Sequence, residues 1–533
     1  MSTDAVWISR LAEGVGTALA ATDGPLTGLR FAIKDNIDLV GVPTTAADPR
    51  RTTPAAASAT AVELLLAAGA VPVGKTNLDQ YATGLVGTRS PYGACTSVFS
   101  PLHASGGSSS GSGVAVARGE VDFALGTDTA GSGRVPAAFN DVIGVKPSKG
   151  LVSTTGVVPA CRSLDCVSVF ARDLGTARRV LTVLAQPDPT DPYSRSLAQR
   201  PTPPRPVVAV PDSELDLDPQ HRAAWEEALI LADKLYDVVE VPVGAFLEAA
   251  RLLYEGPWVA ERQLAFGEAL DDDPAVDPTV RAIVAGDRSS AVDAFAGFHR
   301  LAELEARTRP VWDVADALLL PVTPTHPTHA EIAADPIGVN SRLGTFTNMT
   351  NLLDLCAIAV SGPRREDGLP FGVQLLAPAA GDLLLLDLAA TWLGVPETEP
   401  GERPGWTVLA VAGAHLSGQP LNGDLVARGG VLVETTSTDP SYRMYVVDGP
   451  VPRPGVTRVP GAPDGPGLEV ELWALPEAAV GGFLATIAAP LGLGPVLLAD
   501  GRQVTGFVAT ADAVDPQRDI TAYGGWRRWL ASR

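Results

Sequence analysis

The 533-residue chain lacks several features that mark particular classes of protein. It contains no run of about 18 apolar residues, so we expect no membrane span. Its first residues lack a basic stretch followed by an apolar core, so we expect no secretory signal. The four cysteines show no CxxC spacing and are too sparse for a disulfide scaffold, which favours a reducing, cytoplasmic environment.

Positive charge is scarce as well, because 40 basic residues stand against 61 acidic residues and the formal net charge is −21. This balance argues against nucleic acid as a partner, since phosphate binding needs basic patches. An anionic substrate would need locally placed arginines to overcome the repulsion. Lysine is rare enough to shorten the list of candidate lysine bases, which are Lys34, Lys75, Lys146, Lys149 and Lys234.

Alternating helical and strand patterns predict an α/β fold for most of the chain. The expected helices cover 55–70, 222–238 and 244–269, and the expected strands cover 31–38, 71–73, 121–128, 315–325 and 370–378. A stretch rich in Pro, Gly and Glu then predicts a linker at 396–405. Short β-like segments follow it, so we predict one domain over 1–395 and a small β-rich (α+β) domain over 406–533.

Two loops rich in glycine and serine, 105–117 and 126–134, adjoin apolar runs. Neither has the lysine that a phosphate-binding loop carries after its second glycine. The second loop places Ser132 among residues with very small side chains. A serine hydroxyl needs a base to become a nucleophile, and this stretch contains no histidine.

Several motifs in order resemble the amidase signature family. They are KDN at 34–36, GKTN at 74–77, GGSSSGS at 106–112, GTDTAGSGRVPAAF at 126–139, GVKPSKG at 144–150 and GLPFGVQLLAP at 368–378. The resemblance covers roughly residues 10–395. It implies the fold of that family, an α/β domain with a central mixed β-sheet flanked by helices.

The resemblance also implies a Ser–Ser–Lys triad, with Ser132 as nucleophile, Ser108 as bridging serine and Lys34 as base. A lysine accepts a proton only when uncharged, and burial can lower its ordinary pKa of about 10.4 by roughly 3–5 units. The apolar segment before Lys34 favours such a buried position. The family further implies a cis peptide bond at Ser108 and an oxyanion hole of backbone N–H groups. The implied donors are Thr129, Ala130, Gly131 and Ser132.

The segment YEGPWVAER at 254–262 is the main indication of the substrate. Tyr254 and Arg262 are eight residues apart, which on one helix puts them on roughly the same face. An arginine can bind a carboxylate through two parallel hydrogen bonds. With the DTAGS loop and the appended tail, this segment resembles the allophanate hydrolases. The resemblance implies that Tyr254 and Arg262 bind the substrate carboxylate and that Gly84 also contacts the substrate.

The tail segments AGAHLSGQPLN at 412–422 and YGGWR at 523–527 resemble the C-terminal domain of allophanate hydrolases, whose fold is similar to γ-glutamylcyclotransferase. The resemblance implies two steps. Allophanate is first hydrolysed to ammonia and N-carboxycarbamate, and the tail then promotes decarboxylation to carbamate and carbon dioxide. His415 is our candidate catalytic residue in the tail. Glu471 matches the approximate place of the cyclotransferase acid.

We expect no metal or other cofactor. His326 and His329 are closely spaced, but the sequence offers no third ligand, which favours a loop. Cys161 and Cys166 have no histidine nearby in the sequence, which indicates buried thiols.

Three other functions remain open at this point. The chain could be an amidase of another small amide, a glutaminase-type component of a tRNA-dependent amidotransferase, or a degenerate amidase kept as a binding protein. The acidic balance and the tail disfavour the second, and the intact Lys34, Ser108 and Ser132 disfavour the third. By analogy with related enzymes we expect a homodimer. The sequence leaves open a link to a urea carboxylase or to a biuret-producing enzyme of triazine breakdown.

Overall fold

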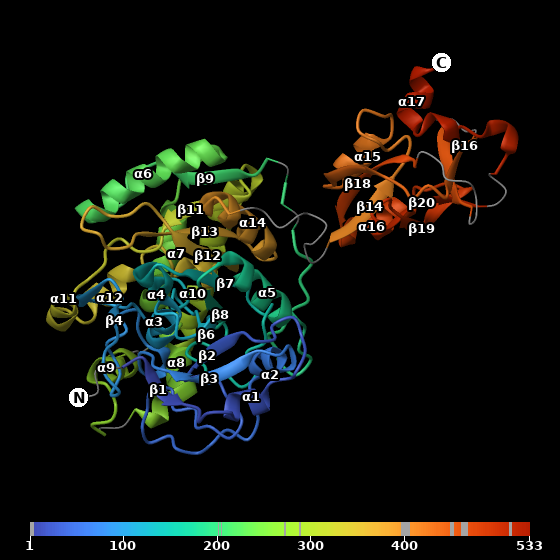
Figure 1. Cartoon of the computed structure of the whole chain (residues 1–533). Coiled ribbons are helices and arrows are strands. Elements are labelled where there is room, and N and C mark those ends of the chain that lie inside the picture. Colours follow the sequence, from blue (N-terminus) through green and yellow to red (C-terminus); the bar gives the residue numbers. More distant parts are fainter. Residues whose placement is uncertain are drawn as a thin grey trace. The chain divides into compact units, whose positions relative to one another are not determined.

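The computed structural model describes residues 5–200, 202–203, 205–270, 273–286, 289–395, 406–447, 452–459, 467–510 and 514–533. The chain divides into two compact units (Figure 1). The first comprises the described residues up to 395 apart from 202–203, which belong with the second unit of residues from 406 onward. The predicted linker at 396–405 lies outside the described residues. None of the helices described is long and apolar enough to cross a membrane.

The described part of the first unit contains one large mixed sheet. Its strand order is β1 (Trp7–Arg10), β3 (Val71–Thr76), β2 (Arg30–Lys34), β6 (Phe123–Thr127), β8 (Val167–Ala171), β7 (Ile143–Lys146), β12 (Leu355–Ser361), β13 (Gly372–Pro378), β11 (Ala317–Pro321), β9 (Val207–Pro211) and β10 (Asp237–Val241). The runs β3-β2-β6 and β11-β9-β10 are parallel, and the other neighbours are antiparallel. Every residue of β6, β8 and β11 is buried, so helices must cover both faces here.

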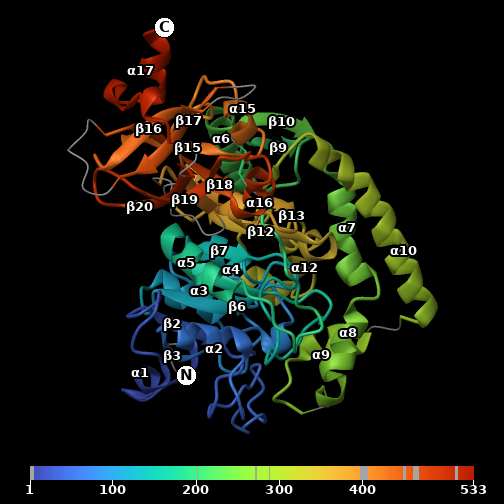
Figure 2. The ribbon, with the colours of Figure 1, turned by 90° about the vertical axis from the view of Figure 1, so that its right-hand side faces the viewer.

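The helices of this unit pack on both faces of the sheet (Figures 1 and 2). They are α1 (Val15–Leu19), α2 (Thr60–Ala67), α3 (Ser110–Ala117), α4 (Val135–Asn140), α5 (Leu174–Leu184), α6 (Pro219–Leu235), α7 (Gly244–Glu255), α8 (Val259–Phe266), α9 (Pro278–Gly286), α10 (Ala291–Thr308), α11 (His329–Ala334), α12 (Gly338–Leu343), α13 (Met349–Leu352) and α14 (Asp382–Leu393). A small hairpin joins β4 (Thr96–Ser97) to β5 (Ser100–Ala104). The predicted mixed sheet flanked by helices is confirmed.

Alternating side chains of β2 show how the two layers form. Phe31 and Ile33 belong to the apolar core shared with α2, α5, α6 and α14. Ala32, between them, belongs to the separate core shared with α3 and α4. Because successive side chains of a strand point to opposite faces, one short strand supports both layers.

The helix predicted at 244–269 is wrong as a single element. The structure ends α7 at Glu255 and begins α8 at Val259. Gly256 between them is extended, with φ −103° and ψ −170°, and Pro257 follows it. A residue before proline is pushed out of the helical region by the proline ring, so the helix stops here. Figure 2 shows α7 running beside α10.

The second unit is built around a smaller sheet, as predicted. Within its described residues the strand order is β15 (Val431–Ser437), β18 (Glu469–Pro476), β14 (Trp406–Val411), β20 (Gln503–Ala509) and β19 (Leu491–Leu497). A separate hairpin pairs β16 (Tyr442–Val447) with β17 (Arg453–Arg458). Three short helices complete it, namely α15 (Asn422–Val426), α16 (Glu477–Leu484) and α17 (Trp526–Ala531). Trp526 and Trp529 anchor α17 in the core.

The sheet of the first unit brings the two serine loops and Lys34 to one place. The strands β2 and β6 are parallel neighbours, with Ile33 opposite Leu125. Both strands therefore end at the same edge, β2 on Lys34 and β6 on Thr127. The loop that carries Ser132 leaves β6 at this edge.

Candidate active site

Lys34 is the central group at this edge of the sheet. Its side chain is fully buried. The amine Nζ lies 2.7 Å from Ser108 Oγ and 2.7 Å from Thr127 Oγ1. Asn36 Nδ2 also donates to Thr127 Oγ1 over 3.2 Å, so Thr127 connects the lysine to the turn after β2. Two hydroxyls thus hold the amine, and no carboxylate of the described residues is in direct contact with it.

Burial lowers the pKa of Lys34 to about 7, because the charged form loses its hydration inside the protein. Three buried carboxylates oppose this shift, those of Asp79, Asp165 and Asp128. The guanidinium of Arg262 adds to it. A substantial share of the amine is therefore uncharged at neutral pH and able to accept a proton.

Ser108 lies in a tight turn that only small residues can form. The peptide bond between Gly107 and Ser108 is cis, as the family resemblance implied. A Cβ at Gly107 would come within 2.1 Å of Asp79 Oδ2, and Gly106 has a φ of +73°. The carbonyl oxygen of Ser108 accepts a hydrogen bond from the backbone N–H of Asp79 over 3.1 Å. The turn thereby fixes the hydroxyl of Ser108 against Lys34.

A buried ion pair shapes the loop that carries Ser132. The Asp128 carboxylate accepts hydrogen bonds from the backbone N–H groups of Gly131 (2.7 Å) and Gly133 (3.0 Å). Arg134 Nε donates to Asp128 over 2.9 Å. Burial by itself would raise the pKa of Asp128, but the adjacent Arg134 guanidinium holds that pKa below its ordinary value. The charged pair thus clamps the loop on both sides of Ser132.

Arg134 also ties this loop to the far part of the chain. Its Nη1 donates to Thr350 Oγ1 and to Gln374 Oε1, each over 2.8 Å, and its Nη2 donates to the Thr347 carbonyl oxygen over 3.1 Å. The guanidinium is fully buried and all its partners are polar. The conformation of the serine loop therefore depends on residues more than 200 positions away.

Ser132 is buried, with 4% of its surface exposed. Within the described residues no hydrogen bond joins its hydroxyl to Ser108 or to any other group. The structure thus brings Lys34 and Ser108 into contact and leaves the hydroxyl of Ser132 without a partner among those residues.

One of the four predicted oxyanion donors is already engaged within the protein. The backbone N–H of Gly131 donates to Asp128 over 2.7 Å. Among the described residues, none accepts a hydrogen bond from the backbone N–H of Thr129, Ala130 or Ser132. Three of the four predicted donors are therefore free. The side chain of Thr129 is fixed separately by a 2.5 Å hydrogen bond to Asp165.

Arg262 and Tyr254 reach this site from two helices rather than from one helix face. Arg262 lies on α8, is 3% exposed and donates from Nη1 to Thr83 Oγ1 over 3.1 Å. Tyr254 lies near the end of α7 and packs against the apolar cluster that contains Ala130. The break at Gly256 and Pro257 turns the chain between them, so the spacing argument from a continuous helix is wrong.

Arg262 is buried, and its partner among the described residues is a hydroxyl rather than a carboxylate. No carboxylate in the described part of the chain lies within ion-pair distance of its guanidinium. Buried charges in proteins are normally paired, as Arg134 is with Asp128 and Arg178 is with Asp387. An unpaired buried guanidinium close enough to lower the pKa of Lys34 is suited to an anionic ligand at this site.

Gly84 lies directly after Thr83, the residue that holds Arg262. A Cβ at Gly84 would come within 2.6 Å of Asp79 Oδ2. Asp79 accepts hydrogen bonds from the backbone N–H groups of Gly87 (3.0 Å) and Arg89 (2.9 Å). Glycine is therefore required here by the close approach of a buried carboxylate, whatever contact it makes with a substrate.

Sequence reasoning missed several residues that build this site. They are Thr83, Thr127, Asp128, Arg134 and Asp165. Thr127, Asp128 and Arg134 lie inside the GTDTAGSGR motif, so their position in that motif could have indicated that they belong to the site. Nothing in the sequence marks Thr83 or Asp165, because their contacts come from segments distant in the chain.

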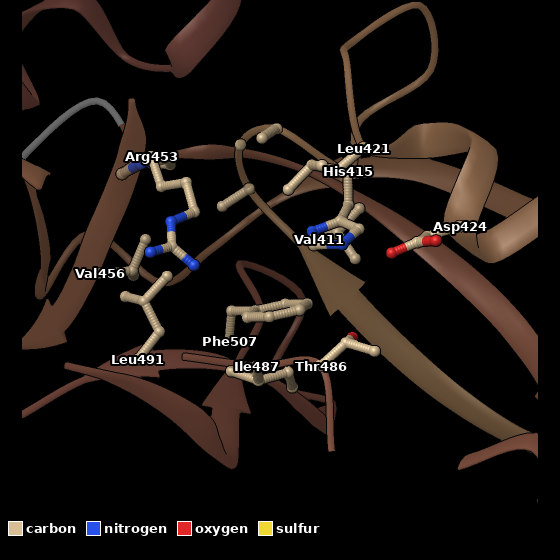
Figure 3. Close-up of a pocket in the computed structure, with 14 residues that line it drawn as sticks. Val411, His415, Leu421, Asp424, Arg453, Val456, Thr486, Ile487, Leu491 and Phe507 are labelled. Carbon is tan, nitrogen blue, oxygen red and sulfur yellow. The ribbon is translucent and has the colours of Figure 1, made fainter. Parts of the chain in front are cut away.

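In the second unit, His415 lines a cavity of about 120 Å³ (Figure 3). Its ring lies between Phe483, in an edge-to-face contact at 5.3 Å, and Phe507, stacked at 5.1 Å. Burial lowers the pKa of His415 to about 4, so the free imidazole is neutral at pH 7. The pKa of His415 falls below the ordinary histidine value because the contacts around the ring remove it from water.

Glu471 does not face this cavity as a free acid. It is 2% exposed and accepts hydrogen bonds from the Ser417 backbone N–H (2.7 Å), the Trp473 indole (3.0 Å) and Arg527 Nη2 (2.5 Å). Burial would raise the pKa of Glu471, but the hydrogen bonds, first that from Arg527, lower it. The carboxylate anchors the segment after β14 to α17, which explains the arginine in YGGWR.

The remaining candidates have structural roles. His326 is buried, forms a hydrogen bond through Nε2 with the Ala104 carbonyl oxygen (2.9 Å) and stacks on Phe139. His329 begins α11. Among the residues that the structure describes, no three His, Cys, Asp or Glu side chains are arranged to hold a metal ion. Lys75 forms a buried ion pair with Asp35 over 2.7 Å. All four cysteines are buried thiols.

Comparison with known proteins agrees with this geometry. The family model described as Amidase matches residues 7–386, and the model described as Allophanate hydrolase C-terminal domain matches residues 407–531. The chain is 38% identical to the crystallised allophanate hydrolase of Kluyveromyces lactis, with a TM-score of 0.81, covering 99% of this chain and 94% of that one.

Two curated relatives are similar to the chain in sequence over different shares of its length. The chain is 41% identical to urea amidolyase of Saccharomyces cerevisiae over 95% of its own length, but it spans only 30% of that much longer protein. It is 32% identical to a glutamyl-tRNA(Gln) amidotransferase component of Haloarcula marismortui, covering 69% of this chain and 95% of that protein.

The first likeness runs through both units, whereas the second is confined to about two thirds of the chain. The chain therefore belongs to the amidase family of enzymes, and its second unit matches the C-terminal domain of allophanate hydrolases.

Proposed function

We propose that the chain hydrolyses allophanate in its first unit and promotes decarboxylation of the product in its second. Allophanate carries a carboxylate one nitrogen away from its terminal amide carbonyl. The observation that carries this proposal is the buried guanidinium of Arg262, which has no carboxylate partner among the described residues. It lies close enough to the Lys34–Ser108 pair to lower the pKa of Lys34. A neutral amide would leave that buried charge without a partner, whereas a carboxylate satisfies it.

In the first step, uncharged Lys34 takes a proton from Ser108 while Ser108 takes one from Ser132. The 2.7 Å contact between Lys34 Nζ and Ser108 Oγ supports the first of these transfers. The unpartnered hydroxyl of Ser132 turns to Ser108 as substrate binds, since catalytic hydrogen bonds often tighten only in the complex. Ser132 then attacks the terminal carbonyl of the amide.

The free N–H groups of Thr129, Ala130 and Ser132 bind the oxyanion that this attack creates. Collapse of the tetrahedral intermediate returns the proton through Ser108 to the leaving nitrogen, and ammonia departs. Water then hydrolyses the acyl-enzyme by the same relay and frees N-carboxycarbamate. Because the donors are fixed by the Asp128–Arg134 clamp, little reorganisation is needed as the charge develops.

In the second step, N-carboxycarbamate loses carbon dioxide in the unit that carries His415. The match of residues 407–531 to the allophanate hydrolase C-terminal domain supports this division. The likeness to the amidotransferase component covers 69% of the chain, whereas the likeness to urea amidolyase covers 95% of it. That difference favours allophanate over glutamine as substrate.

The chain spans 30% of the length of the urea amidolyase that it resembles. We expect an enzyme that carboxylates urea, or one that produces or hydrolyses biuret, to act before it. The homodimer expected from related enzymes stays a prediction, which sedimentation of the purified chain measures directly.

The triad predicts that Ser132→Ala and Lys34→Met each lower the rate of ammonia release from allophanate by roughly a thousandfold or more. The first removes the nucleophile and the second removes the base. Ammonia release is measured in a coupled assay, and the thermal midpoint of each variant verifies folding. Lys234→Met, an exposed lysine on α6, serves as the matched control and keeps wild-type activity. A folded Lys34→Met protein with more than about a tenth of wild-type activity would contradict the mechanism.

The lowered pKa of Lys34 predicts the pH dependence of kcat/KM for ammonia release. Below about pH 7 the amine is protonated and cannot accept a proton, so kcat/KM falls about tenfold per pH unit. Above the pKa the amine is uncharged and kcat/KM levels off. The profile is measured between about pH 5.5 and 9 at constant ionic strength with about 0.15 M salt. A rising limb centred near 10, roughly the ordinary lysine value, would rule out the buried amine as the base.

The carboxylate-binding role of Arg262 predicts a substrate-dependent defect. Arg262→Gln should lower kcat/KM for allophanate by roughly 30- to 1,000-fold, since a charged hydrogen-bonded contact is worth about 2–4 kcal/mol. Turnover of biuret, in which an amide replaces the carboxylate, should change far less. Arg251→Gln, on the exposed side of α7, is the control and leaves both substrates unaffected. Equal losses on allophanate and biuret would remove the carboxylate assignment.

The division of labour predicts that His415→Ala separates the two products. The first ammonia should appear at the wild-type rate, because the first unit is untouched, while carbon dioxide evolution slows. Both are followed on ¹³C-labelled allophanate by NMR and by ammonia assay, with N-carboxycarbamate accumulating. Loss of both products together would show that His415 acts on folding or on the first step.

A further inference from the structure

The cavity of the second unit contains an arginine that neither the sequence motifs nor the family match singles out. Arg453 begins β17 and reaches into the cavity from the side opposite His415, with Phe507 below and Asp424 beyond the histidine (Figure 3). Among the residues that the structure describes, none forms an ion pair or a side-chain hydrogen bond with Arg453. The guanidinium is nevertheless partly buried. It is therefore available to a ligand.

The approach of β17 to the His415 loop is built into the fold. A Cβ at Gly413 would come within 2.1 Å of Pro454 Cδ, so the loop can pass the strand only with glycine there. Asn422 Nδ2 donates to the carbonyl oxygen of His415 over 2.9 Å and fixes the loop from the other side. Arg453 and His415 are thus held on facing walls of one cavity.

The charges around the cavity leave a net positive wall. Asp424 on α15 forms an ion pair with Arg428 over 3.2 Å, so these two charges largely offset each other. The charged groups that influence His415 are Asp424, which raises its pKa, and Arg453 and Arg428, which lower it. Arg453 forms no ion pair with any residue that the structure describes. In a chain with a net charge of −21, such a site selects anions.

The rest of the wall is apolar and includes Val456, Ile487, Leu491 and Phe507. An apolar wall disfavours a localised carboxylate charge and favours its loss as neutral carbon dioxide. One carboxylate of a small dianion would meet the arginine, and the other would lie against these side chains. The cavity therefore combines the two environments that a decarboxylation requires.

We propose that this cavity binds a small dicarboxylate, with Arg453 holding the carboxylate that stays and His415 donating a proton to the atom between the two carboxyl groups. The inference rests on the proposed function for the identity of the ligand, N-carboxycarbamate. The bond between nitrogen and the departing carboxyl carbon breaks, and its electron pair passes to nitrogen. Nitrogen takes the proton of His415, the carboxyl group leaves as carbon dioxide, and carbamate remains. His415 regains its proton from solvent.

The neutral state of the free histidine fits this order of events. With a pKa of about 4, His415 carries no proton to spare in the empty cavity. A dianion beside the ring raises its pKa, since opposite charge stabilises the imidazolium. The proton is therefore taken up with the substrate and delivered only to it.

The binding test uses the full chain and malonate, a stable dicarboxylate. In ¹³C–¹H spectra of histidine-labelled protein, the His415 resonance is identified by its absence in His415→Gln. Malonate should move the titration midpoint of His415 upward by about one pH unit or more in the wild type. The shift should vanish in Arg453→Gln and persist in Arg458→Gln, a change at the exposed end of the same strand. Acetate at the same concentration, with one carboxylate, should produce a much smaller shift.

The catalytic test follows carbon dioxide and ammonia separately on allophanate. Arg453→Gln should slow carbon dioxide evolution roughly 10- to 100-fold, as expected for loss of a charged hydrogen-bonded contact, with the first ammonia release unchanged. Arg453→Lys should retain part of the activity, and Arg458→Gln all of it. A malonate shift that is equal in wild type and Arg453→Gln overturns the proposed binding site, and normal carbon dioxide evolution in Arg453→Gln overturns its proposed part in the decarboxylation.

Failure of the proposed function gives a different pattern. If His415→Ala leaves carbon dioxide evolution unchanged while malonate still shifts His415 in an Arg453-dependent way, the second step lies elsewhere and the dicarboxylate site stands. If His415→Ala slows carbon dioxide evolution and malonate has no effect on His415, the second step stands and the ligand assignment of Arg453 is wrong.

Discussion

The contact between an uncharged lysine amine and a serine hydroxyl is the interaction on which the proposed chemistry depends. Lys34 has no carboxylate in direct contact, and only the hydroxyls of Ser108 and Thr127 receive its amine in the described structure. A carboxylate at that distance would stabilise the ammonium and remove its capacity as a base. The three acids that act on Lys34 are all buried but each is occupied elsewhere, Asp128 by Arg134 and Asp79 and Asp165 by backbone N–H groups. The three aspartates thus hold neighbouring loops in place, and none of them contacts the amine of Lys34 directly.

Arg134, Arg178, Arg262 and Arg453 differ in the partners that their guanidinium groups find among the described residues. Arg134 and Arg178 each meet an aspartate at hydrogen-bond distance, and Arg134 fills its remaining donors with three further oxygens. Arg262 has one hydroxyl partner, and Arg453 has none among the described groups. A guanidinium that the fold leaves unsatisfied costs stability in the empty protein, and that cost is offset when an anion binds. This contrast is the physical basis of the proposal that a strongly acidic chain accepts an anionic substrate.

Burial lowers the pKa of one candidate catalytic group in each unit, and the two groups have different proposed roles. In the first, burial removes the proton from a lysine so that the amine can act as a base. In the second, burial keeps the imidazole of His415 uncharged in a cavity that Arg453 also lines, where we propose that an anion binds. At pH 7 His415 is neutral and a substantial share of Lys34 is uncharged in the free protein, and both groups would gain a proton during the proposed reactions. The physical device is therefore the same, although the proposed reactions differ.

The sequence alone determined the family and the mixed α/β fold, and it predicted Lys34, Ser108 and Ser132 as site residues, because these lie in short motifs at strand ends and in tight turns that local chemistry dictates. The structure brings Lys34 and Ser108 of that set into contact. It also contained the Gly256–Pro257 break, which the apolar periodicity obscured. Only the tertiary structure decided which donors are free. That the N–H of Gly131 is taken by Asp128, that Arg262 lacks an acid and that Arg453 faces His415 all depend on how the chain folds around these groups. Sequence patterns record which side chains are present, whereas burial and hydrogen-bond occupancy arise only when distant segments meet.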